Sequence, residues 1–375
     1  MNIIASSPQG LEDQLAQEII NLGGENIKIR RRFVTFQCNY ETLFKLHFYS
    51  RIAFRFYREV ARFSCTNSEA LYKGVQSSFD WLNWIPPNKA FCVQVSGGSK
   101  LLNHSHFSAL QVKNAIVDMQ KSILGQRSNI SLNDPSIIIH LYLNNQEAVV
   151  SLQTTHESLH KRGYRPSIGY APLKENLAAG LIQLTKWDGD KPFIDIMCGS
   201  GTFLIEAASQ CLKMKIPLKD NYLFENWIDF DKELFEKVKL STYDNKKNNT
   251  NLSKIIGCEI NTDVFEQAKE NINLAGLSKL IEIHNMDFAK LDIHTNKGII
   301  LCNPPYGKKL GKDQKELSDL YSKIGHFLKE KFSGWEFWLL SGNPKLTKYL
   351  KMKASLKIPV SNGGINCRWI KYLIR

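Results

Sequence analysis

The chain has 375 residues, of which 43% are hydrophobic and 23% are charged, and its formal net charge is +13 at pH 7. This length exceeds one ordinary domain, so two or three are expected, and the composition is that of a globular chain rather than a disordered or fibrous one. The positive charge favours a polyanionic partner, although a generally basic proteome would give the same number.

Cysteine usage and the N-terminus bound the setting of the protein. The eight cysteines form no C-x-x-C pair and several lie in apolar, strand-like runs, which predicts reduced thiols and no structural zinc. His104 and His106 have no third ligand nearby, so no metal site is expected. The chain starts without a basic signal region, and no apolar run approaches the roughly 20 residues that cross a bilayer. We therefore expect a soluble, cytoplasmic protein without a membrane partner.

Residues 1–60 predict a small ferredoxin-like module. A strand over residues 2–6 precedes a helix with Leu11, Leu15 and Ile19 on one face, which Gly23-Gly24 ends. One strand over residues 28–36 and a helix over residues 41–50 follow. The cluster Arg30-Arg31-Arg32 either contacts phosphate or guards a solvated strand edge with charge.

Residues 61–158 predict a second compact unit. Helices are expected over residues 69–75 and 108–124, a strand over 91–95, and a hairpin over 137–143 and 148–153. The polar loop over residues 97–106 suits an RNA backbone, and a plain solvated loop is an equal reading. We place a domain boundary at the basic joint that follows, His160-Lys-Arg-Gly-Tyr-Arg165, before a helix over residues 173–184.

From residue 191 strands alternate with helices, which predicts a parallel, doubly wound sheet. The first strand leads into Gly199-Ser-Gly201, a turn that lets a ligand approach the backbone closely. Leu204 replaces the third glycine of the dinucleotide fingerprint. A nicotinamide oxidoreductase is therefore a distant alternative.

Four successive strands of this sheet are expected to deliver polar side chains at their carboxyl ends. These are Asp195, Glu259, Asp287 and Asn303. Singly, each acid is most often a cap or a solvated turn residue, but parallel strands bring their carboxyl ends to one edge, where open α/β sheets bind ligands. The set predicts a shared ligand cleft in which Glu259 can accept both hydroxyls of a ribose.

The fourth strand, residues 299–302, ends in Asn303-Pro304-Pro305-Tyr306. Two prolines fix the backbone and supply no N–H donor, so the strand stops in a stiff platform. The Asn303 side-chain oxygen and the Pro304 carbonyl can accept the two N–H bonds of an exocyclic base amine, and Tyr306 can stack on an extruded base. Taken alone, a proline-capped loop with a surface tyrosine explains this motif equally well.

Together these segments resemble the motifs of class I methyltransferases that use S-adenosylmethionine. The resemblance rests on Asp195-x-Met-Cys-Gly-Ser-Gly-Thr, Glu259, Asp287 and Asn303-Pro-Pro-Tyr-Gly. More specifically, the chain resembles the bacterial 23S rRNA guanine-N2 methyltransferases that carry a THUMP domain. The similarity covers nearly all of the chain, including Ser7-Pro-x-Gly10-Leu-Glu, Ser158-Leu-His-Lys-Arg-Gly-Tyr-Arg165 and Asn362-Gly-Gly-Ile-Asn-Cys-Arg.

The resemblance implies an α/β Rossmann-like methyltransferase domain with a mostly parallel seven-stranded sheet, preceded by an α+β ferredoxin-like plus THUMP module. The implied domains are residues 1–60 (ferredoxin-like), 61–158 (THUMP) and 159–375 (methyltransferase). The donor S-adenosylmethionine would contact Asp195, Cys198, Gly199 and Gly201 with its methionine part, Glu259 with its ribose and Asp287 with its adenine amine. Thr202 is also counted among the donor-binding residues. Asn303, which is also counted in the donor site, would act with Pro304 and Tyr306 on the target base.

The sequence therefore predicts methyl transfer to the N2 amine of a guanine in 23S rRNA or a large-subunit precursor. Adenine-N6 methylation of RNA or DNA is the nearest alternative, and a non-catalytic RNA-binding or ribosome-assembly protein is the alternative from another class. Two positions depart from the family pattern, Ile196 where proline is usual and Asn114 where aspartate is usual. The second methyltransferase domain of some relatives is not expected here.

Overall fold

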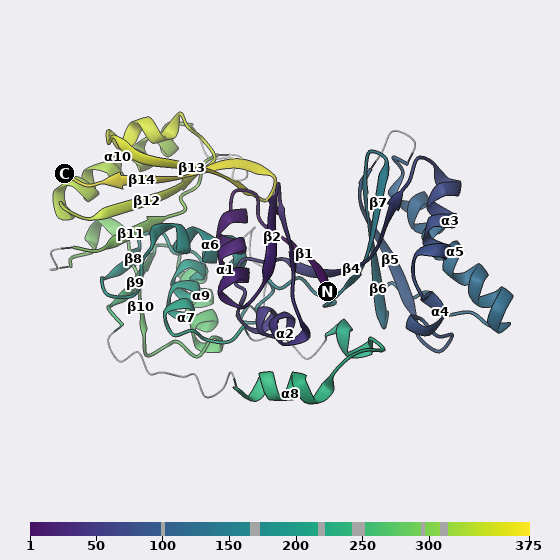
Figure 1. Cartoon of the computed structure of the whole chain (residues 1–375). Coiled ribbons are helices and arrows are strands. Elements are labelled where there is room, and N and C mark those ends of the chain that lie inside the picture. Colours follow the sequence, from purple (N-terminus) through teal and green to yellow (C-terminus); the bar gives the residue numbers. More distant parts are fainter. Residues whose placement is uncertain (99–101, 166–172, 217–221, 242–251, 294–296, 308–313) are drawn as a thin grey trace.

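The computed structural model describes residues 1–98, 102–165, 173–216, 222–241, 252–293, 297–307 and 314–375. Its described strands form two seven-stranded sheets, one within the first 153 residues and one beginning at Phe193. The two sheets lie in separate lobes, and helices lie between them (Figure 1).

The N-terminal sheet is continuous across both predicted modules. Its strands are β1 (Asn2–Ser6), β2 (Glu25–Arg30), β3 (Phe33–Gln37), β4 (Arg55–Ser64), β5 (Phe91–Gly98), β6 (Ile137–Asn144) and β7 (Glu147–Gln153), in the order β2-β3-β1-β4-β7-β6-β5. The long strand β4 pairs with β1 on one side and with β7 on the other. The border expected between residues 60 and 61 thus falls within β4.

The helices of this lobe cover one face of the sheet. They are α1 (Glu12–Asn21), α2 (Tyr40–Tyr49), α3 (Ser68–Ser78), α4 (Trp81–Trp84) and α5 (Ser105–Leu124). Asn39 and Asn67 cap α2 and α3 by accepting from the amides of Thr42 and Ala70. The helices lie on the outer sides of the two halves of the sheet, which leaves the inner face open (Figure 1).

The single strand expected over residues 28–36 is wrong, because the chain turns back at Arg31-Arg32 and forms the hairpin β2–β3. Arg32 has a left-handed backbone, with φ of 70°. The turn contains neither Gly nor Asn, the residues that usually indicate a left-handed turn in a sequence. The backbone N–H of Arg32 instead donates to the Glu12 carboxylate at 2.7 Å, a contact across 20 residues.

The second sheet has the order expected of a Rossmann-like methyltransferase fold. Its strands are β8 (Phe193–Asp195), β9 (Ile255–Glu259), β10 (Ile281–Asn285), β11 (Ile299–Cys302), β12 (Glu336–Ser341), β13 (Ala354–Asn362) and β14 (Ile365–Leu373), in the order β10-β9-β8-β11-β12-β14-β13. Pairing is parallel from β10 to β12, and β14 and β13 complete the edge as an antiparallel hairpin. The predicted fold class is confirmed.

Five further α-helices follow the N-terminal sheet in the described part of the chain. They are α6 (Glu175–Thr185), α7 (Thr202–Cys211), α8 (Lys232–Ser241), α9 (Thr262–Leu274) and α10 (Gln314–Lys331). Short 3₁₀ turns occur at Leu223–Asn226, Phe288–Lys290 and Leu346–Leu350. None of the described helices is both long enough and apolar enough to span a bilayer.

The segment between α7 and β9 extends to the N-terminal lobe and packs against it. The ring of Phe44 in α2 lies 5.2 Å from the ring of Phe224 and 5.1 Å from that of Phe235. Arg58 of β4 pairs with Asp229 at 2.7 Å and lies 5.4 Å from the Trp227 ring. This segment therefore fixes the strand that both halves of the N-terminal sheet share.

A buried ionic cluster makes a second connection between the lobes. The Glu206 side chain of α7 is 2% exposed and meets Arg51 at 3.5 Å and Arg162 at 3.4 Å. Tyr164 donates its hydroxyl to Glu206 at 3.2 Å. Arg51 follows α2, and Arg162 lies in the basic joint. The Glu206 carboxylate therefore connects α7 to the segment after α2 and to the basic joint.

We expect Glu206→Ala to destabilise the protein by about 3–5 kcal/mol, because it leaves two buried guanidinium groups without their carboxylate. Urea unfolding, followed by intrinsic tryptophan fluorescence, measures the shift in midpoint. The matched control is Glu270→Ala on the exposed face of α9, which should leave the midpoint unchanged. Equal midpoints for both variants would contradict the role of Glu206.

Candidate active site

The four polar residues predicted at strand ends lie along one edge of the second sheet. Asp195 and Glu259 close β8 and β9, Asp287 follows β10, and Asn303 follows β11. These strands are direct neighbours in the order β10-β9-β8-β11 and all are parallel. The chain crosses from one side of β8 to the other between β10 and β11, which makes this edge a topological switch point where such sheets bind ligands.

The glycine turn between β8 and α7 supplies an open cradle. Gly199 and Gly201 have φ of 54° and 81°, in the left-handed region that favours glycine. A side-chain carbon added at Gly199 would meet nothing within 4 Å, so the space beside this backbone is free. The Gly199 amide donates to Glu259 at 3.1 Å, and the other oxygen of Glu259 accepts from the Asn261 amide at 2.9 Å. The loop and the acid are therefore held as one unit.

Cys198 and Thr202 flank this turn and are both buried. The Cys198 thiol packs beside Gly257, and burial raises its pKa well above the usual value, so it remains a neutral thiol. The Thr202 hydroxyl accepts a hydrogen bond from Arg165. Arg165 also donates to the carbonyl of Leu173 at 3.1 Å. Arg165 belongs to the basic joint, and no local sequence pattern indicates that its side chain reaches the start of α7.

Asp287 is held by two groups of the protein. Its carboxylate accepts from the Ala289 amide at 2.9 Å and pairs with Lys323 of α10. Burial alone would raise the pKa of Asp287, but the Lys323 ammonium and the Ala289 amide outweigh it and lower the pKa. Asp287 is therefore an ionised acceptor. Lys323 lies 36 residues away and was not predicted as part of this site.

Asp195 is the most buried acid of the set, with 1% of its surface exposed. Loss of hydration raises its pKa to about 7, and the nearby Glu259 charge adds to the effect. The Met197 amide donates to it at 3.2 Å, which offsets part of this shift. A cationic ligand in the cleft would favour the charged form of Asp195.

The segment Asn303-Pro304-Pro305-Tyr306, here called the base platform, contains a hydrogen-bond acceptor to which no described group donates. Asn303 Oδ1 is buried and has no hydrogen-bond partner among the described residues, which is uncommon for a buried polar atom. Pro304, next to it, is buried as well. Lys308, Lys309 and Lys312, which follow this platform in the sequence, lie outside the described residues.

Tyr306 is fixed from the far edge of the sheet. Asn362, in the β13–β14 hairpin, donates to the Tyr306 hydroxyl at 3.0 Å, and the ring packs on Gly342, where an added side-chain carbon would lie 2.9 Å from it. Burial raises the pKa of Tyr306 to about 12, so the phenol is neutral. Asn362 and Gly342 are functional candidates that sequence patterns did not reveal, because both contacts are long-range.

These residues fit a nucleoside-type methyl donor. The open glycine cradle, the three acidic side chains at the strand ends and the unpartnered Asn303 oxygen provide room and acceptors for a cationic, hydroxyl-bearing molecule beside an amine. In the described ranges, no group of three or more His, Cys, Asp or Glu side chains is arranged to hold a metal ion.

Comparison with known proteins decides the family. The methyltransferase domain described as RMKL-like matches residues 162–371, a THUMP domain matches residues 65–153, and the RlmL ferredoxin-like domain matches residues 2–57. The chain belongs to the RMKL-like methyltransferase family. It is thus a methyltransferase with a THUMP domain, of a family that acts on RNA with S-adenosylmethionine as the donor. The predicted family and the predicted methyl donor are both confirmed.

Individual relatives of this RMKL-like methyltransferase extend over the whole chain. The protein slr0064 of Synechocystis sp., provisionally named an RNA methyltransferase, is 36% identical over 98% of this chain and 95% of its own length. The ribosomal RNA large subunit methyltransferase K/L of Vibrio parahaemolyticus is 33% identical over 99% of this chain, which spans only 53% of that relative. SMU.472, provisionally described as a methyltransferase and solved with SAH, is 29% identical, with a TM-score of 0.89 over 100% of this chain and 98% of its own.

Because Asp195 is buried, we expect it to lower the stability of the folded state in a pH-dependent way. The folded state keeps the proton up to about pH 7, while the unfolded chain releases it near 3.8. Between these values the unfolded state binds fewer protons, so Asp195 destabilises the fold progressively as pH rises to about 7 and by a constant amount above it. The isostere Asp195→Asn should therefore gain stability relative to the parent as pH rises from about 4 to about 7.

Thermal unfolding of both proteins without ligand, at about pH 5 and about pH 8, measures this gap. Exposed Asp134→Asn is the control, and its gap to the parent should not change with pH. A gap between Asp195→Asn and the parent that is equal at both pH values would contradict the burial argument.

Proposed function

We propose that this RMKL-like methyltransferase transfers a methyl group from S-adenosylmethionine to the N2 amine of a guanine in 23S rRNA or its precursor. The observation that carries the proposal is the buried, unpartnered Asn303 oxygen beside Pro304, at the edge that also bears the donor acids. The name of the large-subunit K/L relative supports rRNA as the substrate. An rRNA substrate also implies work in the cytoplasm.

The donor supplies an electrophilic methyl group on a positively charged sulfur. The residues of this chain bind and orient it. Glu259 accepts from the ribose hydroxyls, Asp287 accepts from the adenine amine, and the turn from Asp195 to Thr202 encloses the methionine part. Ionised Asp287 and the Glu259 carboxylate are already held in place by the Ala289 and Gly199 amides, so little reorganisation is required.

The target amine is a weak nucleophile because its lone pair is delocalised into the base. Two acceptors, Asn303 Oδ1 and the Pro304 carbonyl, take its two N–H bonds and favour a more pyramidal nitrogen. Tyr306 stacks on the base once it has left the RNA stack. Alignment of amine, methyl and sulfur then supplies most of the acceleration. No strong base is required, because the methylated amine is acidic enough to lose a proton to solvent.

The Asn-Pro-Pro-Tyr platform would also serve an adenine N6 amine, so adenine methylation remains the second candidate. The THUMP match favours RNA over DNA. A role confined to RNA binding or ribosome assembly would leave the donor cleft without use, and a titration with S-adenosylmethionine separates that alternative, since it predicts no binding.

Deleting the gene should remove one N2-methylguanosine from 23S rRNA, as measured by mass spectrometry of digested nucleosides. Restoring the parent sequence should restore the nucleoside. Restoring Asn303→Ala should not, because a lost hydrogen bond of about 1.5–3 kcal/mol to an amine that gains positive charge slows transfer by roughly 10- to 150-fold. Purified Asn303→Ala should lose far more turnover than donor affinity.

Loss of N6-methyladenosine in the deletion strain would keep the mechanism and change the base. No altered nucleoside would contradict rRNA methylation by this chain. Weakened donor binding with full turnover at saturation would contradict the amine-binding role of Asn303.

Asn362 is a positioning residue in this scheme, because it acts on the base only through Tyr306. Asn362→Ala removes a hydrogen bond of about 1 kcal/mol and should lower turnover about fivefold, with donor affinity unchanged. Asn366→Ala, exposed on the same hairpin, is the matched control. In a Tyr306→Phe background, which lacks the hydroxyl, Asn362→Ala should have no further effect on kcat. Additive losses would show that Asn362 acts elsewhere.

A further inference from the structure

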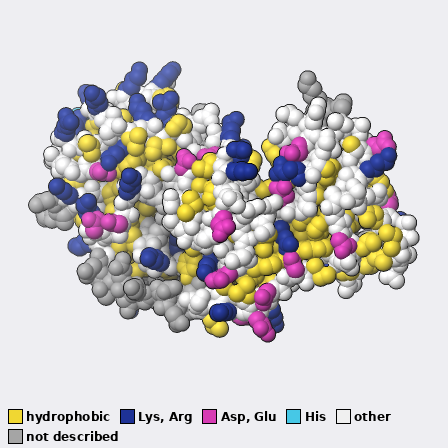
Figure 2. All heavy atoms as spheres, in the orientation of Figure 1, with side chains coloured by type: hydrophobic (Ala, Val, Ile, Leu, Met, Phe, Trp, Pro, Cys, Tyr) yellow, Lys and Arg dark blue, Asp and Glu magenta, His cyan; other side chains and the backbone are white. Residues whose placement is uncertain are grey.

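The inner face of the N-terminal sheet forms an open groove that the helices do not cover. Residues on β1 and β3 alternate between buried side chains under the helices and more exposed ones on this face. The groove has a volume of roughly 780 Å³ and is lined from β2, β3 and β1 on one side and from β4, β7 and β6 on the other. Figure 2 shows it as a notch between the two halves of the lobe, with Lys and Arg side chains on its walls.

The sheet curls strongly around this groove. Three strands separate β3 from β6, so a flat sheet would put them about 19 Å apart. Yet the rings of Phe33 on β3 and Tyr142 on β6 lie 6.2 Å apart. The inner face is therefore a trough with two walls, closed where these rings meet.

The trough carries uncompensated positive charge. Lys28, Arg30 and Arg32 line one wall, and none of them forms an ion pair with a described residue. The two acids of the trough, Glu59 and Glu147, are both paired with Arg62, at 2.8 and 2.6 Å. One guanidinium neutralises only one of these two carboxylates, so the trough lining as a whole, with four cationic and two anionic side chains, keeps a net charge of +2, which complements a phosphate backbone.

Half-buried aromatic side chains also line the trough. Besides Phe33 and Tyr142, the rings of Tyr57 and His140 lie together at 4.5 Å. Burial, with the charge of Arg55, lowers the pKa of His140 to about 4, so this ring is neutral at neutral pH. Flat rings and cations in one trough favour unpaired nucleotides, whose bases can stack, over a duplex, whose bases are already stacked.

One end of the trough leads toward the base platform. The Ser7 amide donates to the Arg32 carbonyl at 2.9 Å, which places the loop after β1 beside the Arg32 end. The Ser361 amide of β13 donates to the Gln9 carbonyl of this loop at 3.2 Å. Asn362, which follows Ser361, donates to the Tyr306 hydroxyl. In Figure 1, β13 reaches across from the second sheet to the N-terminal lobe near β2.

We propose that this trough binds a single-stranded segment of the RNA substrate adjacent to the methylated nucleotide. Phosphates contact Lys28, Arg30 and Arg32, and bases stack on Phe33 and Tyr142. The inference rests on the proposed function only in taking RNA as the substrate, and it is independent of which base receives the methyl group.

The test uses the full chain and a fluorescent oligouridylate of about 15 nucleotides, with the corresponding RNA duplex for comparison. Anisotropy titrations in a salt series give the affinity and its salt dependence. Lys28→Gln with Arg30→Gln should weaken oligouridylate binding and make the slope of log affinity against log salt shallower by about 1.4, since each lost phosphate contact removes about 0.7. Tyr142→Ala should weaken binding about fivefold or more and leave this slope unchanged.

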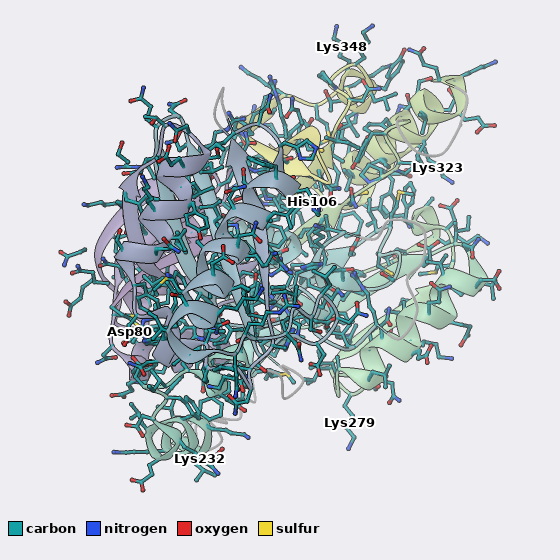
Figure 3. The ribbon with its side chains drawn as sticks, turned by 90° about the vertical axis from the view of Figure 1, so that its right-hand side faces the viewer. Asp80, His106, Lys232, Lys279, Lys323 and Lys348 are labelled. Atoms are coloured by element: carbon teal, nitrogen blue, oxygen red, sulfur yellow. The ribbon has the colours of Figure 1, made fainter. Side chains whose placement is uncertain are left out.

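The control replaces Lys232 and Lys279 by Gln. Both are exposed and point away from the protein body (Figure 3), and neither lines the trough. This variant removes the same charge and should keep the parent affinity and slope. Titration with S-adenosylmethionine, expected to be unchanged in every variant, shows that the methyltransferase domain remains folded.

Parent-like affinity and slope in the Lys28 and Arg30 variant would overturn the proposal, as would failure of the parent to bind oligouridylate. Tighter binding of the duplex would overturn the single-strand assignment. These outcomes are separate from the nucleoside measurement: loss of N2-methylguanosine on gene deletion, with a trough that binds nothing, would retain the function and reject only the trough.

Discussion

The buried Glu206 carboxylate sets the relation between the two lobes. Glu206 lies one turn into α7, whose first residue closes the donor loop, and its partners Arg51 and Arg162 come from the N-terminal lobe and from the joint. Dehydrating such a cluster is costly, and a well-packed apolar contact would be as stable. An apolar contact, however, tolerates sliding, whereas a carboxylate between two guanidinium groups is satisfied in one arrangement. The cluster therefore serves alignment of the donor loop more than stability.

A second contact reaches the acceptor side of the cleft. Gly10 has φ of 91°, and a side-chain carbon there would lie 2.2 Å from the Pro359 carbonyl, so only glycine lets the loop after β1 approach β13. The same strand ends at Asn362, which holds Tyr306. The N-terminal lobe thus touches the donor side through Glu206 and the base platform through β13. A methyl transfer that depends on alignment requires both sides to be fixed relative to the RNA.

Sequence reasoning predicted the strand-end residues because parallel strands must bring their carboxyl ends to one edge, whatever the loops between them. It missed β4, whose period-two alternation is interrupted where the register shifts between Glu59 and Ala61. It also missed the partners Arg165, Lys323 and Asn362. Each of these acts across a long stretch of sequence on a residue already singled out, and no local spacing encodes such a contact.

The cleft at the strand ends carries polar groups that the described part of the fold does not satisfy. Asp195 is buried with its pKa raised to about 7, and Asn303 Oδ1 has no partner in the described chain. Both features oppose folding, because buried polar groups without partners cost free energy. A cationic donor beside Asp195 and an amine at Asn303 would remove both costs at once. These residues are destabilising in isolation and favourable only with ligands present, which is the pattern expected of groups retained for binding rather than for the fold.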